Sequence, residues 1–278
     1  AATKGNTITV NGTMTVSSGI TVLADKFELG FIIAAAGIAN IDGTLNMTTN
    51  GPGGIFTNNG RVNLGSSAFI GGNGSFVLGN NATLAIASAA GIMATGTTGN
   101  IRTSTRTFNA NANYIYNGTV AQSTGDALPA TFSGSLTIDN PTTVTLAAAR
   151  TLSSGNLNLL SGQFVTGSLL TLGNSVSAAN VSINRRGGSM SGAPQSSNWY
   201  NIVYNGASKI TGPEITGTGM RSVTLNLDPS NDLTLDANRT IPGTLTLTQG
   251  DLITGSFALT LSNASGAAVS GGSSSSYI

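Results

Sequence analysis

The 278-residue sequence contains no cysteine and no histidine. Without cysteine there are no thiolate nucleophiles and no disulfides, and without either residue type the usual zinc sites cannot form. The absence of histidine also removes the commonest general base. These absences favour a protein that is not an enzyme and that carries no catalytic residues and no bound cofactor.

Charged residues are also scarce. They make up 8% of the chain, about a third of the usual fraction, and the net charge is +1. The longest basic run is the pair Arg185-Arg186, whereas nucleic-acid binding depends on clustered basic side chains. No apolar run reaches the ~18–20 residues that a membrane-spanning helix requires. We therefore expect neither a nucleic-acid partner nor a membrane span.

The polar residues that are abundant are short ones, namely Ser, Thr, Asn and Gly, with 38 glycines in all. Short polar side chains compete for backbone hydrogen bonds and favour strands and turns over helix interiors. The glycines separate short apolar runs instead of pooling as in a flexible linker. The most apolar run, residues 31–38, is predicted to be one buried strand.

A short phrase recurs along the chain: glycine, a polar residue, then apolar, polar and apolar residues. It occurs at 12–16, 43–47, 60–64, 74–78, 134–138, 155–159 and 243–247. Alternation with a period of two after a glycine predicts a strand entered from a turn, with one face buried. The predicted interior positions are Met14, Val16, Leu45, Met47, Val62, Leu64, Phe76, Leu78, Leu136, Ile138, Leu157, Leu159, Leu245 and Leu247.

The repeated phrase favours an all-β fold, an elongated right-handed parallel β-solenoid (β-helix), with almost no helix. Sandwich strands seldom resemble one another, Asn and Gly turns can stack into ladders, and mid-sized Leu, Ile and Val suit a narrow interior. At ~20 residues per coil the chain would make about 13–14 coils. Sandwich-like portions remain the alternative for part of the chain.

A longer repeat overlies the short phrase, because residues 116–167 match residues 204–255 at an offset of 204 − 116 = 88 positions. We therefore divide the chain into residues 1–100 as β-helix coils, 101–190 as the first module copy and 191–278 as the second. The second copy ends in SGGSSSSYI without a cap. This ending predicts a flexible connector and a natural chain that continues, with coils stacking end to end.

Three stretches of the chain are similar to a known family, namely residues 91–118, YNGTVAQSTGDALP (116–129) and SLTIDNPTTVTLAAARTLSSGNLNLLSGQFVTGSLLTLG (135–173). They resemble repeats of large surface adhesins and fibre proteins of Bacteroidetes. The resemblance covers roughly residues 91–278. It implies an extracellular, cell-surface protein exported by type IX secretion, as gliding-motility adhesins are. The implied partners are further repeats end to end, surface glycans or abiotic surfaces.

The densest acidic group is Asp228, Asp232 and Asp236. One interpretation is a catalytic strip of a polysaccharide lyase or hydrolase, or a Ca²⁺ site, since both chemistries use carboxylates. The other is a solvated outer face with turn aspartates. The second is favoured, because the first module copy has Thr143 and Thr145 where the strip would lie.

Other candidate sites also have structural interpretations. Trp199 and Tyr200 could form a sugar-binding platform, but a plug at the edge of the coil is favoured. The matching pairs Arg150/Arg239 and Tyr116/Tyr204 are interpreted as turn arginines and as tyrosines that cover the coil above. Threonine pairs could bind ice if they stacked in register, and they occur at Thr7/Thr9, Thr13/Thr15, Thr105/Thr107 and Thr244/Thr246/Thr248.

Together these observations predict a structural or adhesive segment of an extracellular bacterial surface protein or filament. The alternatives are a carbohydrate-active β-helix and an ice-binding solenoid.

Overall fold

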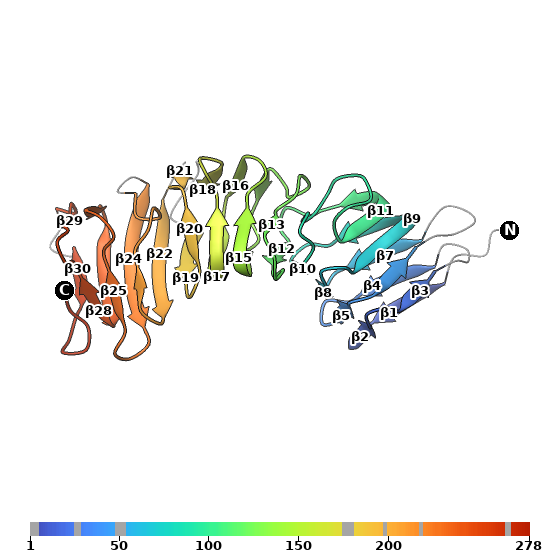
Figure 1. The fold of residues 1–278 in the computed structure, drawn as a ribbon, viewed down its shortest axis with the longest axis horizontal. Helices are drawn as coiled ribbons and strands as arrows, with labels where there is room; N and C mark the ends of the chain where they lie inside the picture. The colour runs from blue at the N-terminus through green and yellow to red at the C-terminus, as the bar shows by residue number, and fades with distance from the viewer. Residues whose placement is uncertain are drawn as a thin grey trace. The chain divides into compact units, whose positions relative to one another are not determined.

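The computed structural model describes residues 6–24, 29–47, 54–173, 181–196, 199–216, 219–264 and 268–278. These residues form parallel strands stacked as a β-solenoid of about 11 turns, and they contain no helix (Figure 1). The predicted parallel β-solenoid is confirmed. Consequently no described segment is a helix with the length and apolar character of a bilayer span. The chain divides into two compact units, Ala1–Gly134 and Ser135–Ile278.

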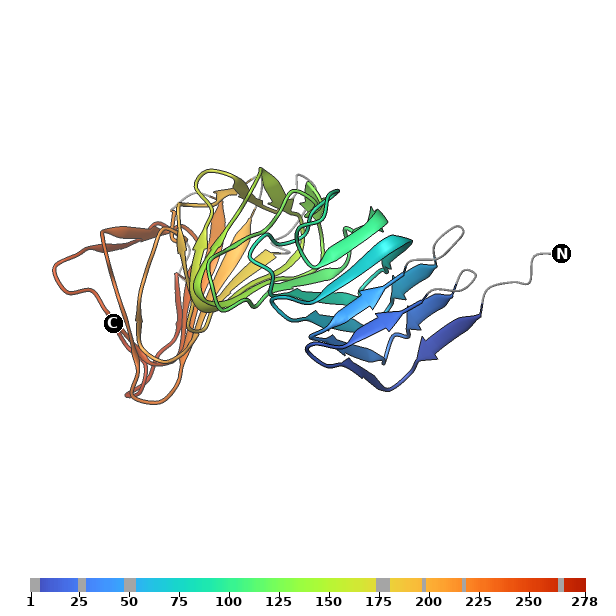
Figure 2. The same ribbon diagram turned by 45° about the vertical axis from the view of Figure 1, so that its right-hand side comes forward.

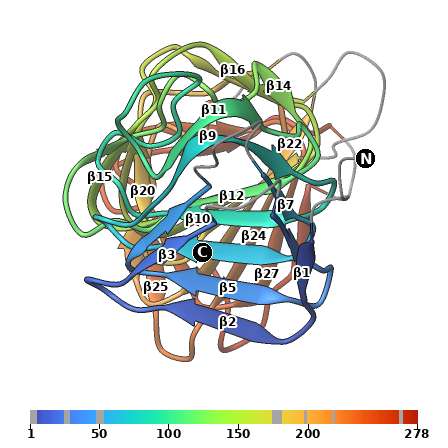
Figure 3. The same cartoon turned by 90° about the vertical axis from the view of Figure 1, so that its right-hand side faces the viewer.

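Each early coil of unit 1 is three-sided, with one short strand on each side (Figures 2 and 3). The first side is β1 (Thr7–Val10), β4 (Gly30–Ile33), β7 (Ile55–Asn58) and the end of β9 (Phe69–Leu78). The second is β2 (Thr13–Val16), β5 (Ile38–Ile41), β8 (Arg61–Leu64), β10 (Thr83–Ile86) and β12 (Asn113–Tyr116). The third is β3 (Thr21–Leu23), β6 (Thr44–Asn46) and the start of β9, and β11 (Ile101–Thr107) follows β9. Two short strands, β13 (Gln122–Ser123) and β14 (Thr131–Phe132), complete the unit.

Unit 2 is built in the same way around one long side. That side is β15 (Leu136–Thr145), β17 (Gly155–Val165), β19 (Val181–Arg185), β22 (Tyr200–Gly206), β24 (Met220–Leu227), β27 (Thr244–Gln249) and β30 (Val269–Gly271). The remaining strands are β16 (Arg150–Leu152), β18 (Leu170–Leu172), β20 (Ser189–Ser191), β21 (Gln195–Ser196), β23 (Lys209–Ile210), β25 (Asp232–Thr234), β26 (Arg239–Ile241), β28 (Asp251–Ile253) and β29 (Leu259–Leu261).

The core consists of columns in which the inward residue of one coil stacks on that of the next. In unit 1 the rings of Phe31, Phe56 and Phe76 stack with centroids 6.2 and 5.8 Å apart. Of the 14 predicted interior positions, all but Met14 are buried. Met14 is half-buried in β2, which pairs with β5 on one side only among the described strands.

Five of the seven glycines that open the repeated phrase are required by the neighbouring coil, namely Gly43, Gly60, Gly74, Gly134 and Gly243. A Cβ on Gly60 would lie 2.2 Å from the carbonyl oxygen of Ala34, and one on Gly43 would lie 2.3 Å from that of Ile20. Both distances are too short for any side chain, although neither glycine has a positive φ. At these positions the phrase begins with glycine because the preceding coil approaches the backbone, whereas Gly155 has a positive φ of 82° and a Cβ on Gly12 would meet no neighbouring atom.

Two expectations are wrong, one about the number of coils and one about the length of a strand. The structure has about 11 turns instead of 13–14, because many coils are longer than 20 residues: Thr83 pairs with Asn113, 113 − 83 = 30 positions later. Residues 31–38 are likewise not one strand. β4 ends at Ile33, residues 34–37 turn, with Gly37 N donating to Ala34 O at 2.7 Å, and β5 begins at Ile38.

The prediction that the end of the chain is a flexible connector is also wrong. Ser276 is fully buried and donates from its hydroxyl to Gly250 O at 2.8 Å. Leu252 N donates to Tyr277 O at 2.8 Å. The SSSSYI segment therefore lies against β28.

Asparagine stacks as expected, but on strands as well as in turns. On the second side of unit 1, Asn63 donates from Nδ2 to Asn40 Oδ1 at 2.7 Å, and these two residues are paired in register. Asn184 and Asn158 repeat the contact in unit 2 at 2.9 Å. The threonine pair Thr13/Thr15 instead stacks on an isoleucine and on Asn40. That pair is not extended in register, as ice binding would require.

Candidate functional site

One inward column of unit 2 contains a charged residue. Strand pairing stacks Leu159, Arg185, Tyr204 and Leu225 in that order. Alternation explains why Arg185 points inward, because Val181 and Ile183 occupy the other inward positions of β19. The arginine is only 5% exposed, and a buried guanidinium needs hydrogen-bond partners for its N–H groups.

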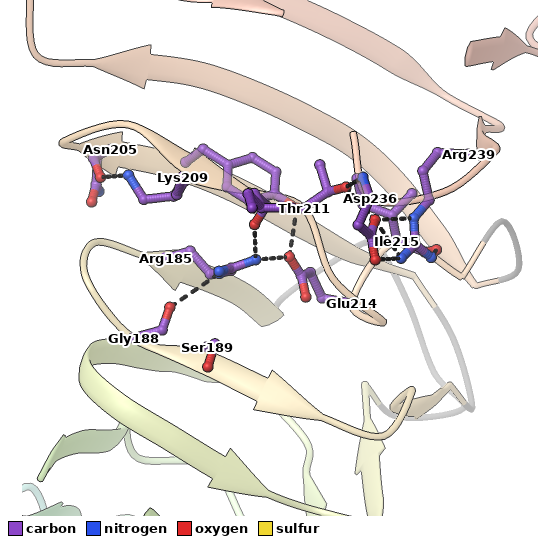
Figure 4. A network of polar contacts seen from close by, with 12 residues as sticks. Arg185, Gly188, Ser189, Asn205, Lys209, Thr211, Glu214, Ile215, Asp236 and Arg239 are labelled. Carbon is purple, nitrogen blue, oxygen red and sulfur yellow. Dashed lines mark hydrogen bonds and ion pairs between the residues drawn. The ribbon is translucent and has the colours of Figure 1, made fainter. Parts of the chain in front are cut away.

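The segment that joins β23 to β24 supplies the counter-charge. Glu214 lies in this segment with no exposed surface, and its Oε1 forms an ion pair with Arg185 Nη1 (Figure 4). Arg185 also donates from Nη1 to Ile210 O at 3.0 Å and from Nε to Gly188 O at 3.1 Å. The arginine thus joins the turn after its own strand to the segment that contains Ile210 and Glu214.

Two buried tyrosines complete the cluster. Tyr204 donates its hydroxyl to Glu214 Oε1 at 2.7 Å, and Tyr200 donates to the backbone oxygen of Glu214 at 2.8 Å. Burial, followed by the nearby Glu214 charge, holds the pKa of Tyr204 well above its ordinary value. Burial raises the pKa of Tyr200 to about 12. Both phenols therefore stay protonated and act as hydrogen-bond donors.

The second oxygen of Glu214 is not satisfied in this way. Glu214 Oε2 is buried and accepts no hydrogen bond from the described residues. Burial alone would lower the pKa of Arg185, but Glu214 and Tyr204 outweigh it and raise that pKa. A buried ion pair stabilises a fold only weakly in net terms, although loss of one partner is costly. The cluster has no solvent access for a substrate, so we interpret it as a support for the 207–216 segment.

Lys209 lies in the same segment. Its ammonium group donates to Asn205 O at 2.8 Å and to Ala207 O. Burial, together with repulsion from Arg185, lowers the pKa of Lys209 to about 8, against a smaller opposite effect of Asp228. Near pH 8 this lysine is therefore partly uncharged.

A second ion pair lies at the surface beside the cluster. Arg239 donates to Asp236 from Nε at 2.9 Å and from Nη2 at 2.7 and 2.6 Å. Its Nη1 donates to Ile215 O at 3.0 Å. Burial alone would raise the pKa of Asp236, but hydrogen bonds from Arg239 and Thr211 outweigh it and lower that pKa. Figure 4 shows that this pair and Glu214 flank the same segment.

A cleft of about 500 Å³ opens next to this ion pair. It is lined by Ala193, Pro213, Ile215, Thr216, Asn238, Arg239 and Thr240. Three of these residues belong to the segment that Glu214 anchors. The buried cluster therefore fixes one wall of the cleft. Asp236 fixes the guanidinium group of Arg239, which forms another part of the cleft wall.

The structure does not bring the predicted acidic strip together as one site. Asp228 is exposed after β24, Asp232 lies on β25 in register with Asp251, and Asp236 is paired with Arg239. Among the described residues no group of three or more Asp or Glu side chains could hold a metal ion. Asp25 and Glu28 lie outside the described residues.

The other predicted candidates are also dispersed. Trp199 is 48% exposed whereas Tyr200 is fully buried, so the two rings do not form a common platform. Arg150 is nearly buried and donates from Nη1 to Ala149 O at 2.9 Å. Tyr116, the counterpart of Tyr204, is also buried, but its hydroxyl donates to Thr124 O at 2.8 Å, where Tyr204 bonds to a carboxylate.

Sequence reasoning missed the Arg185–Glu214 pair. The alternation in 181–185 was a usable signal, because it places Arg185 on the same face as Val181 and Ile183. Nothing in the sequence near Glu214 indicates that this residue points inward. Comparison of the chain with protein-family models, with curated proteins and with solved structures finds no match.

Proposed function

We propose that this chain is a structural and adhesive segment of an extracellular bacterial surface protein or filament. The observation that carries the proposal is the repetition of in-register parallel strands, coil upon coil, within each unit. Each coil contacts mainly its neighbours, so an array of this kind lengthens by adding coils. Such an architecture suits a spacer that holds contacts away from the cell.

The placement of the polar residues supports the same proposal. The amides of Asn40 and Asn63 bond to each other, and Asp236 is occupied by Arg239. These side chains hold neighbouring coils and turns together. We further propose that the chain is not an enzyme, that it needs no cofactor and that it resides at the cell surface. Export by type IX secretion and an origin in Bacteroidetes rest on the sequence resemblance alone.

Electron microscopy of proteins carrying one, two and four joined copies of the chain tests the spacer. We expect rods whose length grows in proportion to the copy number, and thin rods or filaments in the native secreted material. A compact native protein whose size does not follow the copy number would contradict the proposal. Immunogold labelling of intact source cells tests the location, and label confined to the cell interior would contradict it.

A polysaccharide screen separates this proposal from a carbohydrate-active enzyme. The chain is incubated with acidic and neutral polysaccharides, and new reducing ends or unsaturated products are measured. We expect no turnover. Turnover that disappears in Asp232→Asn or in Asp236→Asn would establish an enzyme instead.

A further inference from the structure

From the geometry of the cleft beside Arg239 we infer a binding site for an uncharged carbohydrate. The inference goes beyond the proposed spacer, because it assigns a ligand class to one place on unit 2. The cleft volume of about 500 Å³ falls within the roughly 300–1,000 Å³ that small-molecule sites occupy. The ligand class follows from the charges and hydrogen-bonding groups that line it.

The charge in the cleft is already balanced. Arg239 is the only charged residue among the described residues that line it, and Asp236 holds the guanidinium through Nε and Nη2. Of the five N–H groups of an arginine, three bond to Asp236 and one to Ile215 O. One N–H group is left, and it belongs to a neutralised pair. A phosphate or carboxylate would therefore find little net positive charge.

The remaining polar groups suit hydroxyls. Asn238 accepts from Ala258 N with Oδ1 at 2.8 Å, which leaves its Nδ2 as a donor. The Thr240 hydroxyl makes no hydrogen bond with the described residues and can both donate and accept. Pro213 and Ile215 add an apolar surface for the C–H face of a sugar ring. A polyol needs this combination of fixed donors, an acceptor and an apolar patch.

The site is also held in place before any ligand arrives. Glu214 is anchored inside the coil by Arg185 and Tyr204, and it lies between two cleft residues, Pro213 and Ile215. A pre-organised wall lowers the entropy that binding costs. A buried charge in a column otherwise made of leucine and tyrosine departs from the packing rule of this fold, and such departures concentrate at functional sites.

The test uses the full chain, immobilised, against two panels of probes. One panel contains neutral oligosaccharides of glucose, galactose, mannose and N-acetylglucosamine, and the other contains galacturonate and sulfated oligosaccharides. We expect at least one neutral probe to bind. Thr240→Val and Arg239→Lys should each weaken that binding about tenfold, because each loses a hydrogen bond of the cleft.

The matched control is Thr260→Val. Thr260 pairs in register with Thr240 on the neighbouring coil but does not line the cleft. The Thr260→Val variant should therefore bind the neutral probe with the same affinity as the unmodified chain. Circular dichroism melts confirm that the variants fold. The inference is overturned if no neutral probe binds, if Thr240→Val binds as well as Thr260→Val, or if the acidic panel binds better. The rods seen by electron microscopy would be unaffected by any of these results, so the two proposals fail separately.

Discussion

Arg185 and Tyr204 are register neighbours on β19 and β22, and both bond to the same carboxylate oxygen of Glu214. The column that contains them is aliphatic on either side, with Leu159 before and Leu225 after. One coil of the solenoid is therefore held by charge-assisted hydrogen bonds where its neighbours are held by apolar contact. Because hydrogen bonds replace apolar contact here, the stability of this coil depends on each of Arg185, Tyr204 and Glu214.

Arg185→Met should destabilise unit 2 by about 3–5 kcal/mol, because it leaves Glu214 buried without its counter-charge. Urea denaturation followed by circular dichroism measures the change. Arg186→Met is the matched control, since Arg186 is the exposed next residue, and it should change the stability by less than about 0.5 kcal/mol. Equal effects of the two substitutions would show that the ion pair is not needed.

The double variant Arg185→Met/Glu214→Gln separates the lost pair from the orphaned charge. Glutamine keeps the shape of Glu214 but carries no charge, so the double variant should be more stable than Arg185→Met alone. A double variant that is less stable than Arg185→Met would show that the carboxylate is not what makes the single substitution costly.

The glycines of the repeated phrase give a second prediction. A Cβ on Gly60 would meet the carbonyl oxygens of Ala34 and Gly37 at 2.2 and 2.3 Å, whereas a Cβ on Gly12 would meet nothing within 4 Å. Gly60→Ala should therefore cost about 1–3 kcal/mol or more through overpacking, and Gly12→Ala should be nearly neutral. Thermal unfolding of the two variants compares the same substitution in the same phrase. A stable Gly60→Ala variant would contradict the close approach of the coils.

The phenylalanine stack of unit 1 gives a third prediction. Phe56 lies between Phe31 and Phe76 and is fully buried, so Phe56→Ala should cost about 3–5 kcal/mol through the cavity that it leaves. The neighbouring Ile55 is 50% exposed, and Ile55→Ala should cost much less. Chemical denaturation measures both, and similar losses would show that the stack does not carry the stability of unit 1.

The repeated phrase predicted most of the core because its period of two is a local property of the chain. Leu157 and Leu159, for example, are buried as their alternation requires. The number of turns was harder to predict, since long segments such as residues 87–112, which include β11, lengthen individual coils without changing the phrase.

The candidate site was less predictable than the core. The position of Arg185 follows from alternation, but that of Glu214 depends on how a turn folds back into the coil. The Asp228–Asp236 strip was dense in sequence, yet its members point to different partners: Asp236 bonds to Arg239, and Asp232 stacks on Asp251. Spacing along a chain does not determine convergence when residues fall in turns.

The last prediction concerns Lys209. Its pKa is lowered from 10.5 to about 8, chiefly by burial and next by Arg185, so between these pH values the unfolded chain binds a proton that the folded chain has released. Stability should therefore rise with pH from about 8 to 10.5. Subtracting the stability curve of Lys209→Met isolates this slope, because the tyrosines that titrate in the same range are common to both proteins.

A direct measurement follows the Lys209 ε-methylene signal by NMR, where we expect a titration midpoint near pH 8. Asp228 partly offsets the lowering of this pKa, so Asp228→Asn should move the midpoint to a still lower pH. Asp228 is exposed, so this variant should leave the fold intact. A midpoint near 10.5 in the unmodified chain, or an upward move in Asp228→Asn, would show that Lys209 is solvated and independent of the buried cluster beside it.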